Sequence, residues 1–164
     1  QSAADADAFS YTYMKFDLKG IPAGTVLKSA KLILTHVPNA GYPKSAMGKT
    51  PIEARAMTTD WTEKTWNFEY SKKNPPQAGK DAIFGTSSDA GYAQDREFKI
   101  EIDLSKGGFA KYFEKSVGKD LGLALTSAID PGENGRAYIY KMYSRNEEKV
   151  TRRPVLQLVT TLSE

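Results

Sequence analysis

The chain has 164 residues, of which 40% are hydrophobic and 26% are charged, and its formal net charge is +3. This length and composition indicate a single soluble globular domain over residues 1–164. The net charge is too small for a dedicated nucleic-acid binder, and no apolar run approaches the roughly 20 residues of a membrane span, so neither partner is expected. Without cysteine, the stability must come from the core or from a bound metal.

The first predicted strand covers residues 10–18 and follows residues 1–9, which form an acidic lead-in or loop. Polar and apolar side chains alternate strictly along this strand. Because side chains of a strand point to opposite faces in turn, Phe16 should enter a core while Tyr13 and Lys15 face solvent.

Further strands are predicted wherever apolar and polar residues alternate between groups of turn residues. They cover residues 26–37, 51–57, 96–104, 121–126, 137–143 and 154–161. Seven short strands joined by turns indicate an all-β fold, and we expect an antiparallel jelly-roll-like β-sandwich with one short helix.

The remaining segments are a corner, a loop and a helix. Trp61 and Trp66 belong to a short corner, and both are expected to pack into the core. Residues 72–93 are polar and rich in Gly, Pro and Ser, which predicts a long loop. Apolar residues recur at helical spacing near residues 108–116, which predicts the helix. The side chains expected to be mostly buried are Thr12, Met14, Phe16, Leu32, Leu34, Phe98, Ile100, Ile102, Leu123, Leu125, Tyr140, Met142, Leu156 and Leu158.

Residues with catalytic or metal-binding chemistry are sparse. His36 is the single histidine, and no serine carries the glycine motif of a nucleophile elbow, so a structural histidine and no catalytic residue are expected. Nothing marks out a carboxylate pair for a glycosidase, and a zinc site would need more His or Cys ligands. A structural calcium ion is the one cofactor considered, and a solvated turn is the alternative. The candidate oxygen ligands are those of Asp5, Asp7, Asp130, Glu133 and Asn134.

Three groups of residues occur in an order that resembles a known family. The first group is Tyr13-Met14-Lys15-Phe16-Asp17-Leu18, Ile21-Pro22-Ala23-Gly24 and Ser29-Ala30-Lys31-Leu32. The second is Trp61-Thr62-Glu63 with Thr65-Trp66-Asn67, and the third is Tyr143-Ser144-Arg145 with Arg153-Pro154-Val155-Leu156. Together they resemble the DNRLRE-type domains. Two departures are that Asn146 replaces the family's Glu after Ser-Arg, and that the family has another strand or two before the first group.

The resemblance implies a jelly-roll β-sandwich attached to secreted polysaccharide-degrading enzymes, in a family with alginate-binding members. We therefore expect a secreted, non-catalytic carbohydrate-binding module for an acidic polysaccharide such as alginate, fused to a catalytic domain. One alternative is a structural or adhesive spacer without a sugar site. Another is a uronate lyase, because Tyr13-Met14-Lys15 is similar to the Tyr-Phe-Lys of jelly-roll alginate lyases, although their Gln-x-His strand motif and Arg-rich strand are missing.

The outward rows of the predicted strands supply the candidate glycan-binding residues. Tyrosine offers a flat face to a sugar ring, and lysine or arginine binds a carboxylate. If the strands are neighbours in one sheet, six of these side chains converge on one groove. The candidates are Tyr13, Lys15, Lys31, Arg55, Lys141, Tyr143 and Arg145. For Arg145 a second interpretation is a structural ion pair with Glu63 or Asp17.

Overall fold

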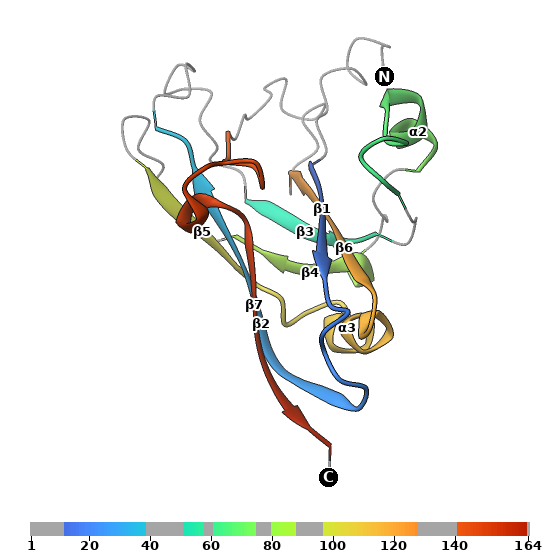
Figure 1. Ribbon diagram of the computed structural model, residues 1–164. Helices are drawn as coiled ribbons and strands as arrows, with labels where there is room; N and C mark the ends of the chain where they lie inside the picture. Colours follow the sequence, from blue (N-terminus) through green and yellow to red (C-terminus); the bar gives the residue numbers. More distant parts are fainter. Residues whose placement is uncertain are drawn as a thin grey trace.

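The computed structural model describes residues 12–38, 51–57, 61–74, 80–87, 97–127 and 141–163, which form two antiparallel β-sheets (Figure 1). Sheet A contains, in spatial order, β1 (Thr12–Asp17), β6 (Asp120–Ser127), β3 (Ile52–Ala56) and β4 (Ile83–Thr86). Sheet B contains β5 (Phe98–Asp103), β2 (Thr25–His36) and β7 (Val155–Leu162). The helices are α2 (Phe68–Lys73) and α3 (Phe109–Ser116), with single 3₁₀ turns η2 (Lys80–Ala82) and η3 (Val150–Arg152). The predicted all-β antiparallel sandwich is confirmed, and the chain crosses repeatedly between the sheets as jelly rolls do.

The core lies between the two sheets and follows the alternation of each strand. Met14 and Phe16 on β1 pack against this core but are only half-buried, because β1 is the edge strand of sheet A. Their inward direction is the one predicted. The core side chains larger than alanine with 2% or less exposed surface are Leu32, Leu34, Phe84, Ile100, Ile102, Leu104, Phe109, Phe113, Leu121 and Leu123.

Several residues of the predicted core are less buried than expected. Thr12, the first residue of the edge strand β1, is exposed. Tyr140 lies outside the described residues. The half-buried members, all on edge strands or at an isolated bridge, are Phe98, Met142, Leu156 and Leu158.

The prediction of a loop over residues 72–93 is wrong at both its start and its centre. Helix α2 continues to Lys73, and β4 lies within the range and pairs antiparallel with β3. Phe84 on this strand is 2% exposed. A strand of four residues is too short to display an alternating pattern, which is why the composition of the segment concealed it.

Helix α3 lies where the helical spacing predicted it and anchors one end of the sandwich. Phe109 and Phe113, four residues apart, are both buried in the core. The Tyr112 hydroxyl lies at the carbonyl oxygens of Met57 and Gly122, and the Gly122 contact measures 2.7 Å. The helix is therefore tied to the ends of both β3 and β6.

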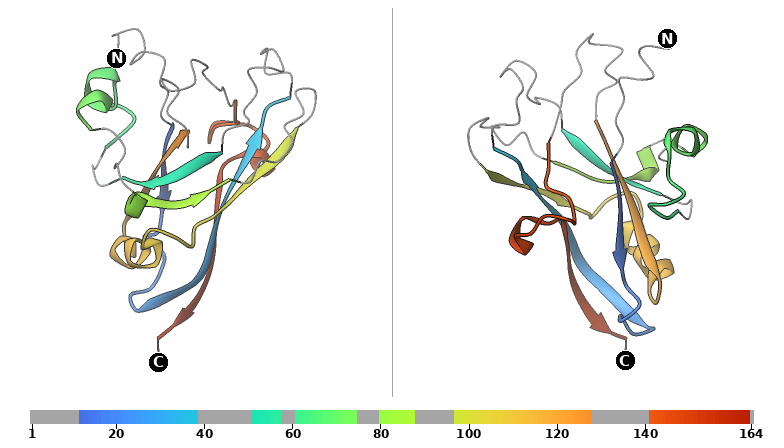
Figure 2. Two further views of the ribbon diagram at one scale, coloured as in Figure 1. Left: turned by 180° about the vertical axis from the view of Figure 1, so that it is seen from behind. Right: turned by 45° about the horizontal axis from the view of Figure 1, so that its top comes forward.

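The two sheets touch along one side and separate along the other. At the touching side, β4 passes so close to β5 that a Cβ on Gly85 would lie 2.1 Å from the Asp103 carbonyl oxygen. The Lys106 amide also donates to the Phe84 carbonyl oxygen at 2.9 Å. On the other side are the edge strands β1 and β7, and no described strand joins them. Figure 2 shows the sheets converging toward the C-terminal end and diverging away from it.

Candidate functional site

An aromatic cluster lies on the outer face of sheet A and consists of Tyr13, Trp61, Trp66 and Tyr70. The ring centroid of Trp66 is 4.2 Å from that of Tyr13, 5.3 Å from that of Trp61 and 5.2 Å from that of Tyr70. All four side chains are half-buried. The tryptophans thus pack on the outside of the sandwich, and the expectation that they enter the core is wrong.

Lys15 is part of the same surface. Its Nζ donates to the Trp61 carbonyl oxygen and lies 5.3 Å from the centroid of the Trp61 ring, within the range of a cation–π contact. Tyr13 and Lys15, which were predicted on the outward row of β1, therefore lie together on the outer face of sheet A, and the indole ring of Trp61 lies beside them. The sequence analysis did not include Trp61 and Trp66 among the residues of this surface. The one sequence feature that pointed to an outer location was their position beside the turn at Thr62.

Local hydrogen bonds hold the tryptophan-bearing segment in place. The amide of Thr62 donates to the Thr65 hydroxyl at 3.0 Å, and the Trp66 amide donates to the Thr62 carbonyl oxygen at 2.9 Å. The Asn67 side chain then accepts the Tyr70 amide at 2.9 Å, as the N-cap residue of α2. Both tryptophans and Tyr70 are consequently positioned by a tight turn and a capped helix.

Arg55 lies on the same sheet face as Tyr13 but already has a carboxylate partner. Tyr13 and Arg55 both pair with Ala124, one from each side of β6. The Arg55 Nε donates to Glu53 Oε2 at 2.8 Å, and the two side chains are 18% and 10% exposed. Arg55 is thus a partly buried member of a structural ion pair rather than an open cationic site.

Lys31 lies on the outer face of the other sheet. Its Nζ is 2.7 Å from Glu101 Oε2 and 4.0 Å from Asp103 Oδ1. The hydrogen bond from Lys31 to Glu101, with the charge of that carboxylate, raises the lysine pKa above its ordinary value. Because β2 belongs to sheet B while β1 and β3 belong to sheet A, the prediction of one groove lined by all six side chains is wrong.

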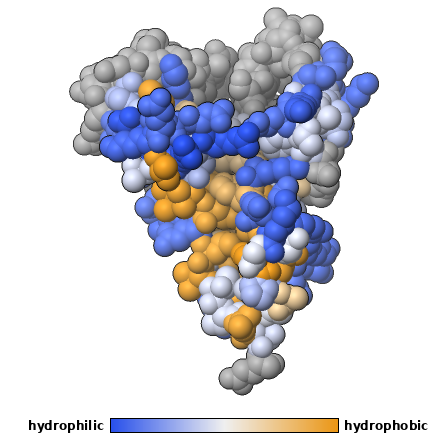
Figure 3. All heavy atoms as spheres, viewed as in Figure 1, coloured by the Kyte–Doolittle hydropathy of each residue, from blue (hydrophilic) through white to orange (hydrophobic). Residues whose placement is uncertain are grey.

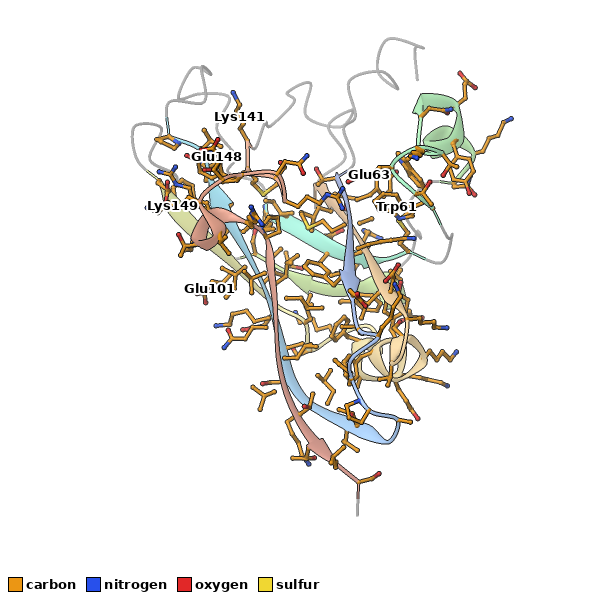
Figure 4. The ribbon with its side chains drawn as sticks, in the orientation of Figure 1. Trp61, Glu63, Glu101, Lys141, Glu148 and Lys149 are labelled. Atoms are coloured by element: carbon orange, nitrogen blue, oxygen red, sulfur yellow. The ribbon has the colours of Figure 1, made fainter. Side chains whose placement is uncertain are left out.

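Lys141 and Tyr143 lie at the end of β2, on the side of sheet B. The Val37 amide donates to the Lys141 carbonyl oxygen at 2.9 Å, and the Tyr143 amide donates to the Thr35 carbonyl oxygen at 3.0 Å. In Figure 4, Lys141 and Glu101 lie toward β5 and β7, whereas Trp61 and Glu63 lie beside β1. Lys141 therefore lies away from Trp61, which contacts Lys15.

The Tyr143 ring is covered by an arginine that the sequence reasoning did not single out. The Arg152 guanidinium carbon is 4.9 Å from the ring centroid. The same guanidinium makes ion pairs with Glu97 at 2.7 Å and with Glu147 at 3.4 Å. This network joins η3 to the start of β5, and it gives Tyr143 a structural neighbour on one face.

Arg145 forms an ion pair with Glu63, which is one of the two partners expected if the arginine is structural. Its Nη2 is 2.6 Å from Glu63 Oε2, and the two side chains are 71% and 60% exposed. The pair connects the segment after Tyr143 with the turn that carries Trp61. It links the sheet B side of the molecule to the aromatic cluster on sheet A.

The described residues offer little reactive chemistry. His36 is 1% exposed and stacks on Phe98 with ring centroids 4.7 Å apart, and burial lowers its pKa below the ordinary 6.5. Within the described ranges, no three His, Cys, Asp or Glu side chains are grouped as metal ligands would be. The calcium candidates are outside those ranges, and no described helix is long and apolar enough to cross a membrane.

Comparison of the chain with models of known protein families and with curated proteins produced no match.

Proposed function

We propose that this chain is a non-catalytic carbohydrate-binding module for an acidic polysaccharide such as alginate. The observation that carries the proposal is the aromatic cluster with Lys15 on the outer face of sheet A. Two tryptophans, two tyrosines and a lysine lie together there, and all five residues are half-buried. In this proposal the module is secreted and holds an attached polysaccharide-degrading enzyme on its substrate.

The chemistry of the cluster suits a charged sugar polymer. Aromatic faces cover the apolar faces of sugar rings, while the lysine ammonium supplies a polar contact at the ring edge. Lys64, exposed in the turn between the two tryptophans, adds a second cation to the segment whose Trp61 contacts Lys15. A uronate chain carries one carboxylate per sugar, so it can meet cations and rings in succession.

Three of the other predicted cations already form ion pairs within the chain. Lys31, Arg55 and Arg145 each have a carboxylate partner within the chain, at Glu101, Glu53 and Glu63. A polyanion would have to displace those partners to reach them. The same ion pairs favour the second candidate function, a structural spacer without a sugar site.

Calorimetric titration of alginate, polygalacturonate and a neutral glucan, at low and high salt, separates the candidates. Exposed ion pairs contribute about 0.2 to 1 kcal/mol each, so Lys15→Met should weaken alginate binding by a factor of about 1.4 to 5. Lys31→Met, on the opposite sheet, is the matched control and should leave it unchanged. Added salt should weaken binding, because screening shortens the reach of each charge.

Three results would count against the module as proposed. Absence of binding to every acidic glycan favours the spacer, and equal affinity for the neutral glucan removes the role of charge. An equal loss in the Lys31→Met control would mean that binding depends on the net charge of the protein and not on the aromatic cluster. Release of unsaturated uronate from alginate, followed by ultraviolet absorbance, would establish the lyase alternative.

A further inference from the structure

Strand β7 is an edge strand without the usual protection against pairing with another chain. Its sequence, Val-Leu-Gln-Leu-Val-Thr-Thr-Leu, contains no charged residue, no proline and no glycine. Edge strands commonly carry charges or prolines, which discourage a further strand from adding. The edge strand β1 has Lys15 and Asp17, and the edge strand β5 has Lys99, Glu101 and Asp103.

The fourth edge strand, β4, is covered by a neighbouring strand of the other sheet. β4 passes directly against β5, where Gly85 allows the close approach to the Asp103 carbonyl oxygen. Among the described strands, β7 is thus the one edge that has neither charge nor cover.

Apolar side chains of β7 are partly or fully exposed on both faces of sheet B, although on the outer face they alternate with Gln157, which pairs with Lys31 of β2. On the outer face Val155 and Val159 are 43% and 51% exposed, and at the strand end Leu162 is 66% exposed. On the inner face Leu156 and Leu158 pack against the core but are only half-buried. Figure 3 shows the resulting apolar area, which extends over β7 and toward β1.

We propose that β7 pairs antiparallel with β7 of a second copy of this chain. A two-fold axis perpendicular to sheet B, near Leu158 or Val159, joins the two three-stranded sheets edge to edge and keeps both inner faces on the same side. Leu156 and Leu158 of each copy then gain apolar neighbours from the other.

The charge distribution selects a second copy as the partner. Self-pairing places identical strands against each other, so any charge near the centre of β7 would meet a like charge across the axis, and none is present. Along the chain the nearest cations, Arg152 and Arg153, precede the strand, and Lys31 of the adjacent strand β2 is paired with Glu101. In an antiparallel pair these arginines lie at opposite ends of the joint edge, so those of one copy do not repel those of the other.

One strand edge buries less surface than a standard protein–protein interface, so the dimer is weak and concentration-dependent.

Sedimentation velocity over a wide range of protein concentration tests this pairing. The parent chain should move from monomer to dimer as the concentration rises. Val159→Lys and Val159→Glu should each shift the midpoint of dimerisation at least tenfold upward, because like charges then meet across the axis. An equimolar mixture of the two variants should recover dimerisation, because each lysine then meets a glutamate.

Val26→Lys is the matched control, because Val26 is 43% exposed on sheet B but pairs with Thr161 of β7 and so lies one strand away from the proposed dimer edge. It should leave dimerisation unchanged. A monomeric parent at every concentration would overturn the proposal. Equal disruption of the dimer by Val26→Lys would also overturn it, because that result indicates stacking of sheet faces. A mixture of the two Val159 variants that stays monomeric would overturn it as well. Circular dichroism of each variant confirms that the fold is retained.

Discussion

The closest approach of the two sheets is at Gly85, and adding one methyl group there should loosen the sandwich. In Gly85→Ala the new Cβ would lie 2.1 Å from the Asp103 carbonyl oxygen and 2.9 Å from Ile102 Cγ2. Ordinary contact begins near 3.4 Å, so β4 and β5 must move apart by more than 1 Å. Backbone cannot rotate away as a flexible side chain can. The strain is therefore shared by the strands on both sides of the contact.

The magnitude follows from what the displacement disturbs. Overpacking a core costs about 1 to 3 kcal/mol, and weakening the hydrogen bond from the Lys106 amide to the Phe84 carbonyl adds about 1 kcal/mol. We expect a loss of about 3 kcal/mol in the free energy of unfolding. For a chain of this length that lowers the melting temperature by about 6 to 12 °C.

Differential scanning calorimetry and urea unfolding measure this loss. Gly20→Ala is the matched control, because a Cβ there meets no heavy atom within 4 Å. It should change the melting temperature by no more than about 1 °C. If Gly85→Ala unfolds within about 0.5 kcal/mol of the parent, the close contact between β4 and β5 is not as described.

Three further predictions concern His36, Tyr112 and Arg145. Burial lowers the pKa of His36, so the unfolded chain binds its proton more readily, and the free energy of unfolding should fall as pH drops below about 6.5. Urea unfolding between pH 7.5 and 5.5 should show this slope, and His36→Gln should flatten it. Tyr112→Phe leaves the Gly122 carbonyl oxygen without its 2.7 Å partner and should cost about 1 to 2 kcal/mol by urea unfolding. The pair of Arg145 with Glu63 is exposed, so Arg145→Ala should cost less than about 1 kcal/mol by calorimetry.

Each of these results has a contrary outcome. A parent chain as stable at pH 5.5 as at pH 7.5 would show that His36 is not buried as a neutral group. Unchanged stability in Tyr112→Phe would mean that the hydroxyl is solvated rather than bound to the two strand ends. A large loss in Arg145→Ala would give this ion pair a greater structural role than its exposure suggests.

The positions of most strands and of the helix could be predicted from local pattern. Alternation along β1, β2, β3 and β5 identified which side chains face the core, and the four-residue spacing of Phe109 and Phe113 identified α3. These features depend only on neighbours in the chain. β4 was missed because four residues, one of them Gly85, are too few to show a period.

The candidate site could be predicted only in part, because the pattern along one strand does not show which strands lie beside it. Alternation shows that Tyr13, Lys15 and Lys31 point outward, but it does not show which strands are neighbours. Strand pairing is a long-range property, and it places Lys31 on the opposite sheet from the other two.

The sequence by itself determined the inward and outward rows of the strands, the helix, and the scarcity of catalytic and metal-binding side chains. Only the tertiary structure decided which outward rows share a face, that Trp61 and Trp66 pack outside the core against Tyr13, and that the cation of Arg145 is paired with Glu63. It also decided that β7 is an edge. Contacts between residues far apart in the chain depend on how the two sheets pack, and no local period records that packing.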